Sequence, residues 1–283
     1  MMTVSCLEIG MKDSKSTPSR PNRLSSTLDS ALSNGAVERI LQSRAVFLDY
    51  DGTLTPIVAR PELAILSESV RVIIRQLATS CPVTIVTGRD VDIIRKLVDI
   101  DGIGYVGSHG LDIAGPAETG LRHQVGTAFV PELDAMESSL RLKTDGIEGV
   151  LIERKRFSIS VHIRQADPNR HSSVETIIDE LNLAHPTLRL EKGKLLYELR
   201  PDIEWDKGEA VKWLIDGMSL DLSTTLYIGD DLTDETAFSV LGGRGMTVVV
   251  AGPHEDRPTA AGFRLDDPSE VEVLLSWLVE QYR

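Results

Sequence analysis

Short apolar runs alternate with segments of helical periodicity from about residue 45 onwards, and this alternation constrains the fold more than any other feature of the sequence. Ala45–Leu48 is an uninterrupted apolar run, as expected of a strand buried on both faces. Val70, Ile74 and Leu77 then recur at helical spacing behind Ser67, a residue suited to cap a helix. Strands that alternate with helices form a parallel sheet with helices on both faces, so we expect an α/β fold.

The middle of the chain follows a different order. Two helical segments are each followed by a pair of strand-like runs, which predicts two antiparallel hairpins. The helices are expected at 131–143 and 172–183, and the paired runs at 149–154 with 158–164 and at 188–191 with 195–199. Helix, hairpin, helix, hairpin makes a small α+β module, which we place at residues 126–201.

The order of these segments divides the chain into three parts. The first 25 residues or so are rich in Ser, Lys, Arg and Pro and contain little that could form a core, so we expect a flexible leader over residues 1–36. The α/β core then comprises residues 37–125 and 202–283, on either side of the module at 126–201.

Charge and cysteine content limit the partners and the compartment. The net charge of -13 opposes binding to nucleic acids and anionic membranes, while an anionic small molecule needs only local positive charge. Cys6 and Cys81 form neither a disulfide framework nor a metal-thiolate pattern, which suits a reducing interior. No apolar run approaches a membrane span, and the N-terminus lacks the apolar core of a signal peptide. We expect a cytoplasmic monomer that binds a small molecule.

Two carboxylates follow the first predicted strand. Asp49 and Asp51 stand at its carboxyl end, where α/β folds place their ligands. Two such charges repel each other, and a divalent cation can hold them together. The alternative is an Asp-Gly turn in which both carboxylates only accept hydrogen bonds from loop amides.

A second acidic group follows the strand expected at 225–228 and opens a helix. Its members are Asp230, Asp231, Asp234 and Glu235. They offer the hard oxygen ligands that Mg²⁺ takes in proteins. Helix capping could account for Asp231 or Glu235, but it does not easily account for four acids beside a site that already holds two.

Two further motifs could bind a phosphoryl group. Thr87, Gly88 and Arg89 follow a predicted strand, and a hydroxyl with free amides at a helix start can hold a phosphoryl oxygen. A plain capped turn between strand and helix has the same pattern. Lys207 opens another helix, where it could neutralise phosphate charge and pair with a nucleophilic carboxylate, although a single lysine is more often solvated at the surface.

In this order, D-x-D-G-T, T-G-R, a lysine at a helix start and G-D-D-x-T-D-E resemble the four motifs of the haloacid dehalogenase (HAD) superfamily of phosphatases. The last motif, with Gly107–Gly110 and the inserted module, is similar to the trehalose-6-phosphate phosphatases in particular. The resemblance extends from about residue 44 to the end of the chain. It implies a Rossmann-like HAD core with a parallel sheet and helices on both faces, and an inserted α+β cap of the C2 type.

The resemblance also implies a role for each motif residue. Asp49 would be the nucleophile that becomes phosphorylated, and Asp51 would protonate the leaving sugar oxygen and then deprotonate water. Thr87, which stands where many members have serine, and Lys207 would hold the transferring phosphoryl group. The Mg²⁺ cofactor would be bound by Asp49, by the backbone carbonyl of Asp51 and by Asp230. Asp231 and Asp234 would lie nearby or act through water.

The cap would recognise the sugar. In trehalose-6-phosphate phosphatases a similar E-x-K and a later K-x-x-x-E contact the sugar. On this chain the matching residues are Glu153, Lys155, Lys194 and Glu198, with His109, Gly88 and Arg89 as further substrate-binding candidates, and with His162 and Arg164 as weaker ones. The alternative is a set of cross-strand ion pairs on a solvated sheet face.

The activity implied by the resemblance is magnesium-dependent hydrolysis of trehalose 6-phosphate through an aspartyl-phosphate intermediate. A phosphatase for sucrose phosphate or a glycosyl-glycerate phosphate would share the same core motifs, and only the cap could separate these substrates. An inactive phosphosugar-binding regulatory protein is an alternative of another class. The presence of every catalytic residue expected of an active enzyme argues against it.

Overall fold

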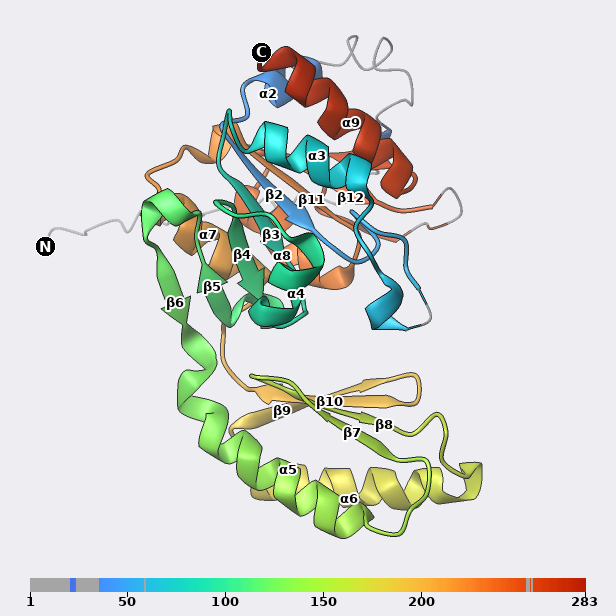
Figure 1. Cartoon of the computed structure of the whole chain (residues 1–283). Helices are drawn as coiled ribbons and strands as arrows, with labels where there is room; N and C mark the ends of the chain where they lie inside the picture. The colour runs from blue at the N-terminus through green and yellow to red at the C-terminus, as the bar shows by residue number, and fades with distance from the viewer. Residues whose placement is uncertain (1–20, 24–35, 59, 253–254, 256) are drawn as a thin grey trace, which may run out of the picture.

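The computed structural model describes residues 21–23, 36–58, 60–252, 255 and 257–283 (Figure 1). Within them, the larger sheet has nine strands in the order β1-β13-β12-β11-β2-β3-β4-β5-β6. These are β1 (Asn22–Arg23), β13 (Phe263–Leu265), β12 (Met246–Val250), β11 (Thr225–Gly229), β2 (Ala45–Asp49), β3 (Val83–Val86), β4 (Gly104–Gly107), β5 (Asp112–Ala114) and β6 (Arg122–Gln124). Neighbours from β1 to β4 are parallel, whereas β4, β5 and β6 pair antiparallel.

Helices cover both faces of this sheet. The alternation within β2 sends Val46 and Leu48 into one apolar cluster, and Ala45 and Phe47 into another. The first cluster lies under α2 (Ala36–Leu41), α3 (Glu68–Leu77), α4 (Val91–Val98) and α9 (Pro268–Gln281), and the second under α7 (Lys207–Gly217) and α8 (Glu235–Leu241). The predicted α/β fold is confirmed. The short strands β5, β6 and β13 were not predicted, because three residues are too few to show a period.

The inserted segment forms a second sheet with the order β7-β8-β10-β9, antiparallel throughout. Its strands are β7 (Leu151–Arg154), β8 (Ile159–His162), β9 (Leu188–Gly193) and β10 (Leu196–Pro201). One face packs on α5 (Val130–Thr144) and α6 (His171–Ala184) through residues such as Ile159 and Leu199. The other face is turned towards the larger sheet (Figure 1).

Most of the leader expected at 1–36 lies outside the described residues, so that prediction stays open. Within its range, Asn22 and Arg23 pair in parallel with Phe263 and Arg264 of β13. No helix in the described part of the chain combines the length and the apolar character needed to cross a bilayer.

Candidate active site

The strand order brings the predicted motifs to one edge of the sheet. β11, β2 and β3 are parallel neighbours, so the loops that follow them leave the sheet side by side. Asp49 ends β2, Asp230 follows β11, and Thr87 follows β3 with 1% of its surface exposed. Carboxylate oxygens of Asp49, Asp230 and Asp234 lie within 4.8 Å of one another.

Lys207 joins two of these carboxylates. Its ammonium donates to Asp49 Oδ1 over 2.8 Å and to Asp234 Oδ1 over 2.7 Å. All three groups are buried, with 3% of Lys207, 4% of Asp49 and 0% of Asp234 exposed. Burial opposes the charge of Lys207, but Asp49 and Asp234 raise its pKa above the ordinary value, so this lysine is cationic.

Asp234 organises the site by accepting hydrogen bonds from several donors. Besides Lys207, the Tyr227 hydroxyl donates to its Oδ1 over 2.6 Å. The backbone N–H groups of Asp230 and Asp231 donate to its Oδ2 over 3.1 and 3.0 Å. A carboxylate accepts about four hydrogen bonds, so these four donors fix the orientation of the Asp234 side chain. Asp231 is exposed and caps the turn that follows it, accepting from the Leu232 N–H over 2.7 Å.

The remaining acids are held together against their repulsion. Burial raises the pKa of Asp49 well above its ordinary value; Lys207 lowers it in part, while Asp234 and Asp230 raise it further. Burial also raises the pKa of Asp230 to about 6, with a contribution from the charge of Asp234. Burial and mutual repulsion thus disfavour the ionised forms of Asp49 and Asp230 unless a further cation offsets their charge. Together with Asp234, these carboxylates could hold a metal ion, as is general among HAD phosphatases.

Gly52 allows Asp230 to approach the loop after β2. Its φ of +83° lies in the left-handed region, and a Cβ atom there would sit 2.0 Å from Asp230 Oδ2. Only glycine accommodates both the conformation and the contact. The Asp-Gly pair that could have been a simple turn is thus the surface against which the second acidic motif packs.

Arg89 pairs with Asp51. Its Nε donates to Asp51 Oδ2 over 2.7 Å and its Nη2 to Asp51 Oδ1 over 2.6 Å, a bidentate arrangement. Nη2 also donates to the Pro61 carbonyl over 2.8 Å, and the guanidinium lies over the Tyr50 ring. Arg89, predicted to bind substrate, therefore contacts the predicted acid–base residue in this structure.

His109 is placed by strained backbone. Ser108 and His109 have φ values of 49° and 55°, in the left-handed region that costs energy for residues other than glycine. The ring packs on Gly88, where a Cβ atom would come within 2.5 Å of it. Burial and the charge of Lys207 lower the pKa of His109 to about 4, so the imidazole is neutral at neutral pH. Its buried Nδ1 has no hydrogen-bond partner within the described residues.

The cap contributes a second polar group. Glu198 Oε1 accepts from Lys155 Nζ over 3.2 Å and from the Ser158 hydroxyl over 3.0 Å. Burial alone would raise the pKa of Glu198, but the charge of Lys155 and the hydrogen bonds from Lys155 and Ser158 lower it overall, so this carboxylate is ionised.

The other predicted sugar-binding residues lie farther out on the cap. Glu153 pairs with His162, whose Nε2 is 3.0 Å from Glu153 Oε2, as the cross-strand alternative allows. Lys194 is exposed in the turn between β9 and β10, and Arg164 is exposed after β8. The structure thus brings together Lys155 and Glu198, and leaves Lys194 apart as a solvent-facing side chain.

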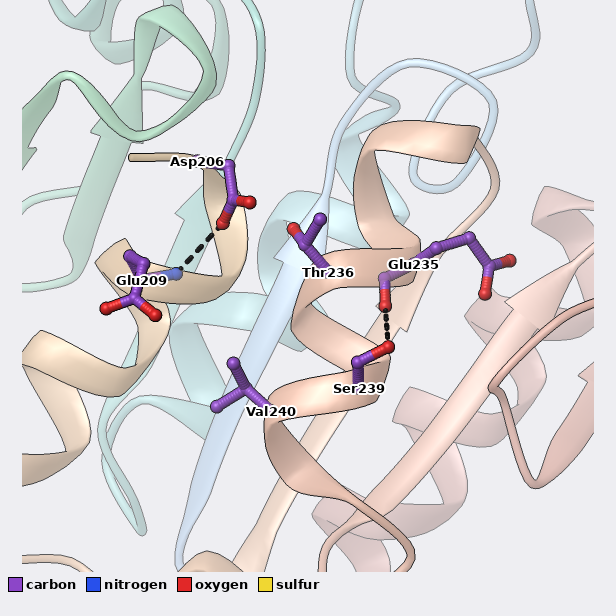
Figure 2. A pocket seen from close by; sticks show the side chains of 6 residues that line it. All are labelled: Asp206, Glu209, Glu235, Thr236, Ser239 and Val240. Atoms are coloured by element: carbon purple, nitrogen blue, oxygen red, sulfur yellow. Dashed lines mark hydrogen bonds between the residues drawn. The ribbon is translucent and has the colours of Figure 1, made fainter. Parts of the chain in front are cut away.

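A hollow of about 310 Å³ lies between the start of α7 and α8. Figure 2 shows the side chains that line it: Asp206, Glu209, Glu235, Thr236, Ser239 and Val240. Two of its three acids, Asp206 and Glu235, already have hydrogen-bond partners. Asp206 accepts from the Glu209 N–H, and Glu235 pairs with Arg257 and accepts from the Ala260 N–H. Since no predicted catalytic residue lines this hollow, we place the active site at the strand ends instead.

Two residues of the site were missed from the sequence. Tyr227 supports Asp234 from within β11, and Ser158 supports Glu198 from the end of the cap turn. Ser158 lies 40 residues from Glu198, and Tyr227 lies seven residues before Asp234 in a different element, so neither contact follows from the pattern of one helix or strand. The alternation of β11, which separates Tyr227 from Leu226 and Ile228, could only have shown which face Tyr227 is on.

A parallel sheet with a lysine and several carboxylates at its strand ends, interrupted by an α+β insertion, is the arrangement of HAD-type hydrolases, as predicted. A family model described as trehalose-phosphatase matches residues 47–269. The chain belongs to the trehalose-phosphatase family.

Individual relatives agree with this assignment. Trehalose-phosphate phosphatase B of Arabidopsis thaliana is 36% identical over 249 residues, covering 84% of this chain and 67% of that protein. Trehalose-phosphate phosphatase of Mycobacterium tuberculosis is 37% identical over 256 residues, covering 89% of this chain and 64% of that protein. The chain thus spans about two thirds of the length of these relatives. The C-terminal domain of the Candida albicans trehalose-6-phosphate phosphatase superposes with a TM-score of 0.71 and 27% identity, covering 93% of this chain and 99% of that domain.

Proposed function

We propose that this protein hydrolyses trehalose 6-phosphate to trehalose and phosphate, with Mg²⁺ as cofactor and Asp49 as nucleophile. The observation that carries the proposal is the buried Lys207, which binds Asp49 at the edge of the sheet where Asp230 and Thr87 also lie. The family and the names of the relatives support trehalose 6-phosphate as the substrate.

The reaction proceeds in two displacements. A carboxylate oxygen of Asp49 attacks phosphorus, the bond from phosphorus to the sugar oxygen breaks, and Asp51 gives that oxygen its proton. Water then attacks the aspartyl-phosphate, Asp51 takes a proton from it, and phosphate leaves with Asp49 restored. Lys207 and Thr87 bind the phosphoryl oxygens throughout.

The Asp51–Arg89 pair fits one half of this cycle. The two guanidinium hydrogen bonds fix the orientation of the Asp51 side chain, which suits a group that must accept a proton from a positioned water. Protonation of the leaving oxygen requires Arg89 to release Asp51 first. We therefore propose that Arg89 controls when Asp51 can exchange a proton with the substrate or water. Gly88, which has no side chain, lets the His109 ring pack closely against this loop.

The acids fit a magnesium site. Asp49, Asp230 and the Asp51 carbonyl would bind the ion, and Asp231 and Asp234, which also hold the loop, would lie nearby or act through water. When bound, Mg²⁺ offsets the repulsion between the nucleophile and the phosphate dianion.

Removal of the metal should stop the reaction. We expect a chelator to abolish phosphate release and added Mg²⁺ to restore it. Because Asp230 has a pKa of about 6 without metal, a proton competes with the ion below that pH. The Mg²⁺ concentration for half-maximal activity should therefore rise as the pH falls, by up to about tenfold per pH unit below 6 for the proton on Asp230. Full activity in the chelator, or an unchanged Mg²⁺ requirement between pH 5 and 7.5, would contradict the assignment.

We propose that Glu198 and Lys155 of the cap, together with the neutral His109 of the core, bind the sugar. Glu153 and Lys194 would contact it at the edge of the cap. Charged groups that serve several hydroxyls at once suit a disaccharide. The predicted division into a core at 37–125 and 202–283 and a cap at 126–201 belongs to this proposal, as do a monomeric state and a cytoplasmic location.

Glu198→Ala tests the reading of the sugar. We expect kcat/KM for trehalose 6-phosphate to fall about a hundredfold, because a group left without a charged hydrogen-bond partner costs about 1.5–3 kcal/mol. Turnover of p-nitrophenyl phosphate should change less than twofold. Glu175→Ala, which removes an exposed partner of Lys192 on the outer helix of the cap, is the matched control. Equal losses on both substrates would show that Glu198 does not contact the sugar.

The substrate itself is tested with a panel of sugar phosphates. Faster phosphate release from trehalose 6-phosphate than from sucrose phosphate, glycosyl-glycerate phosphate or glucose 6-phosphate is the expected result. Preference for another member of the panel would agree with the proposed phosphatase mechanism but would show that trehalose 6-phosphate is not the preferred substrate.

A further inference from the structure

Asp90 stands at the N-terminus of α4 without capping it. Its backbone has the extended conformation of an N-cap residue, with φ of −65° and ψ of 144°, yet its side chain accepts no hydrogen bond from the helix. Aspartate used as a cap stabilises a helix by about 1 kcal/mol. The carboxylate of Asp90 has been turned to other partners instead.

Those partners belong to the two parts of the molecule. Asp90 Oδ1 accepts from the Ser108 hydroxyl of the core over 2.7 Å. Asp90 Oδ2 accepts from the backbone N–H of Arg156 over 2.9 Å, and Arg156 lies in the turn between β7 and β8 of the inserted module. One carboxylate therefore bridges the core and the cap.

The cap turn at residues 155–158 makes further contacts with the core. The Arg156 guanidinium donates to Gln124 Oε1 over 3.3 Å and lies 3.7 Å from Asp112. On the side of the inserted module itself, Phe157 is fully buried and packs on Gly126, where a Cβ atom would lie 2.4 Å from the ring. The turn is thus seated in a definite position rather than resting loosely on the surface.

Both ends of the Asp90 bridge carry groups of the proposed site. On the cap, the turn contains Lys155 and Ser158, which both donate to Glu198. On the core, Asp90 directly follows Arg89, and the Ser108 N–H donates to the Arg89 carbonyl over 2.8 Å. The Asp90 side chain consequently connects the cap turn that supports Glu198 with the core loop that carries Arg89.

We propose that Asp90 is a positioning residue for substrate specificity: it seats the cap turn so that Lys155 and Glu198 face the sugar while Thr87 holds the phosphate. This inference rests on the proposed function. It implies that substrates long enough to reach the cap depend on Asp90, whereas small aryl phosphates do not.

Asp90→Ser separates this role from helix stability. Serine caps helices as well as aspartate does, but its hydroxyl is one bond shorter and cannot accept from two partners on opposite sides. We expect the melting temperature to stay equal or rise, kcat/KM for trehalose 6-phosphate to fall about tenfold, and kcat/KM for p-nitrophenyl phosphate to stay within twofold.

Two variants complete the test. Asp90→Asn keeps an oxygen for the Arg156 N–H and offers its amide to the Ser108 hydroxyl, so it should retain most of the selectivity. Asp92→Ser makes the same change at an exposed position in the first turn of the same helix and should match the wild type.

The outcomes are distinguishable. Unchanged selectivity in Asp90→Ser, or equal losses on both substrates, would overturn the role of Asp90. A wild-type protein that releases phosphate from p-nitrophenyl phosphate but shows no preference for trehalose 6-phosphate would overturn the proposed substrate instead.

Discussion

Asp49→Asn should reduce phosphate release from trehalose 6-phosphate by at least about a thousandfold, because an amide cannot form the covalent intermediate. The same variant should not lose stability. Burial raises the pKa of Asp49 in the folded protein, so its ionisation at neutral pH costs folding free energy that the neutral amide does not incur. Lys207 keeps Asp234 as a partner in the variant.

Two measurements check this prediction. Phosphate release gives the activity, and thermal unfolding in a chelator gives the stability of the metal-free protein, which should equal or exceed that of the wild type. Asp216→Asn, at an exposed position near the end of α7, controls for the change of charge and should leave both quantities unaltered. Residual turnover above a few per cent would remove Asp49 as the nucleophile.

Lys207→Met should remove both activity and stability. The variant leaves the buried Asp49 and Asp234 without their shared cation, and the loss of one partner from a buried ion pair costs about 3–5 kcal/mol. Since Lys207 also neutralises phosphoryl charge, kcat should fall at least about a thousandfold on both sugar and aryl substrates. Asp49→Asn and Lys207→Met thus differ in their effect on stability, although both abolish turnover.

The control for Lys207→Met is a second lysine of α7, Lys212. Lys212→Met makes the same substitution at an exposed position of α7, where we expect less than 0.5 kcal/mol of change and full activity. Added Mg²⁺ should recover part of the lost stability of Lys207→Met, because the ion reduces the repulsion among the acids. A variant that unfolds like the wild type would show that the buried ion pairs contribute nothing to the fold.

Much of the fold follows from local patterns. The helix at 68–77 begins where Ser67 predicted it, with the Val70 N–H bonded to the serine hydroxyl over 3.2 Å. The strand at 45–49 is buried throughout, as its uninterrupted apolar run indicated. β5 and β6 escaped prediction because their pairing depends on β4 beside them rather than on their own residues.

The sequence predicted which residues belong to the site better than it predicted the contacts among them. Asp49, Thr87, Asp230 and Lys207 were singled out because each ends a strand or opens a helix. Asp234 was expected near the metal ion or bound to it through water, which stays a prediction; the fold adds that it orients Lys207 and the loop at Asp230. Such a role shows only when its four donors are in place.

By itself, the sequence determined which residues stand at strand ends and helix starts, because hydrophobic period and capping act over a few neighbouring residues. Tertiary structure alone decided which groups meet: the Lys207 ammonium and Asp49, 158 residues apart, and the Asp90 carboxylate and the backbone N–H of Arg156, 66 residues apart. Strand order and the seating of the cap set those distances. No local pattern encodes them, since a hydrogen bond depends on positions in space that only the packed sheets define.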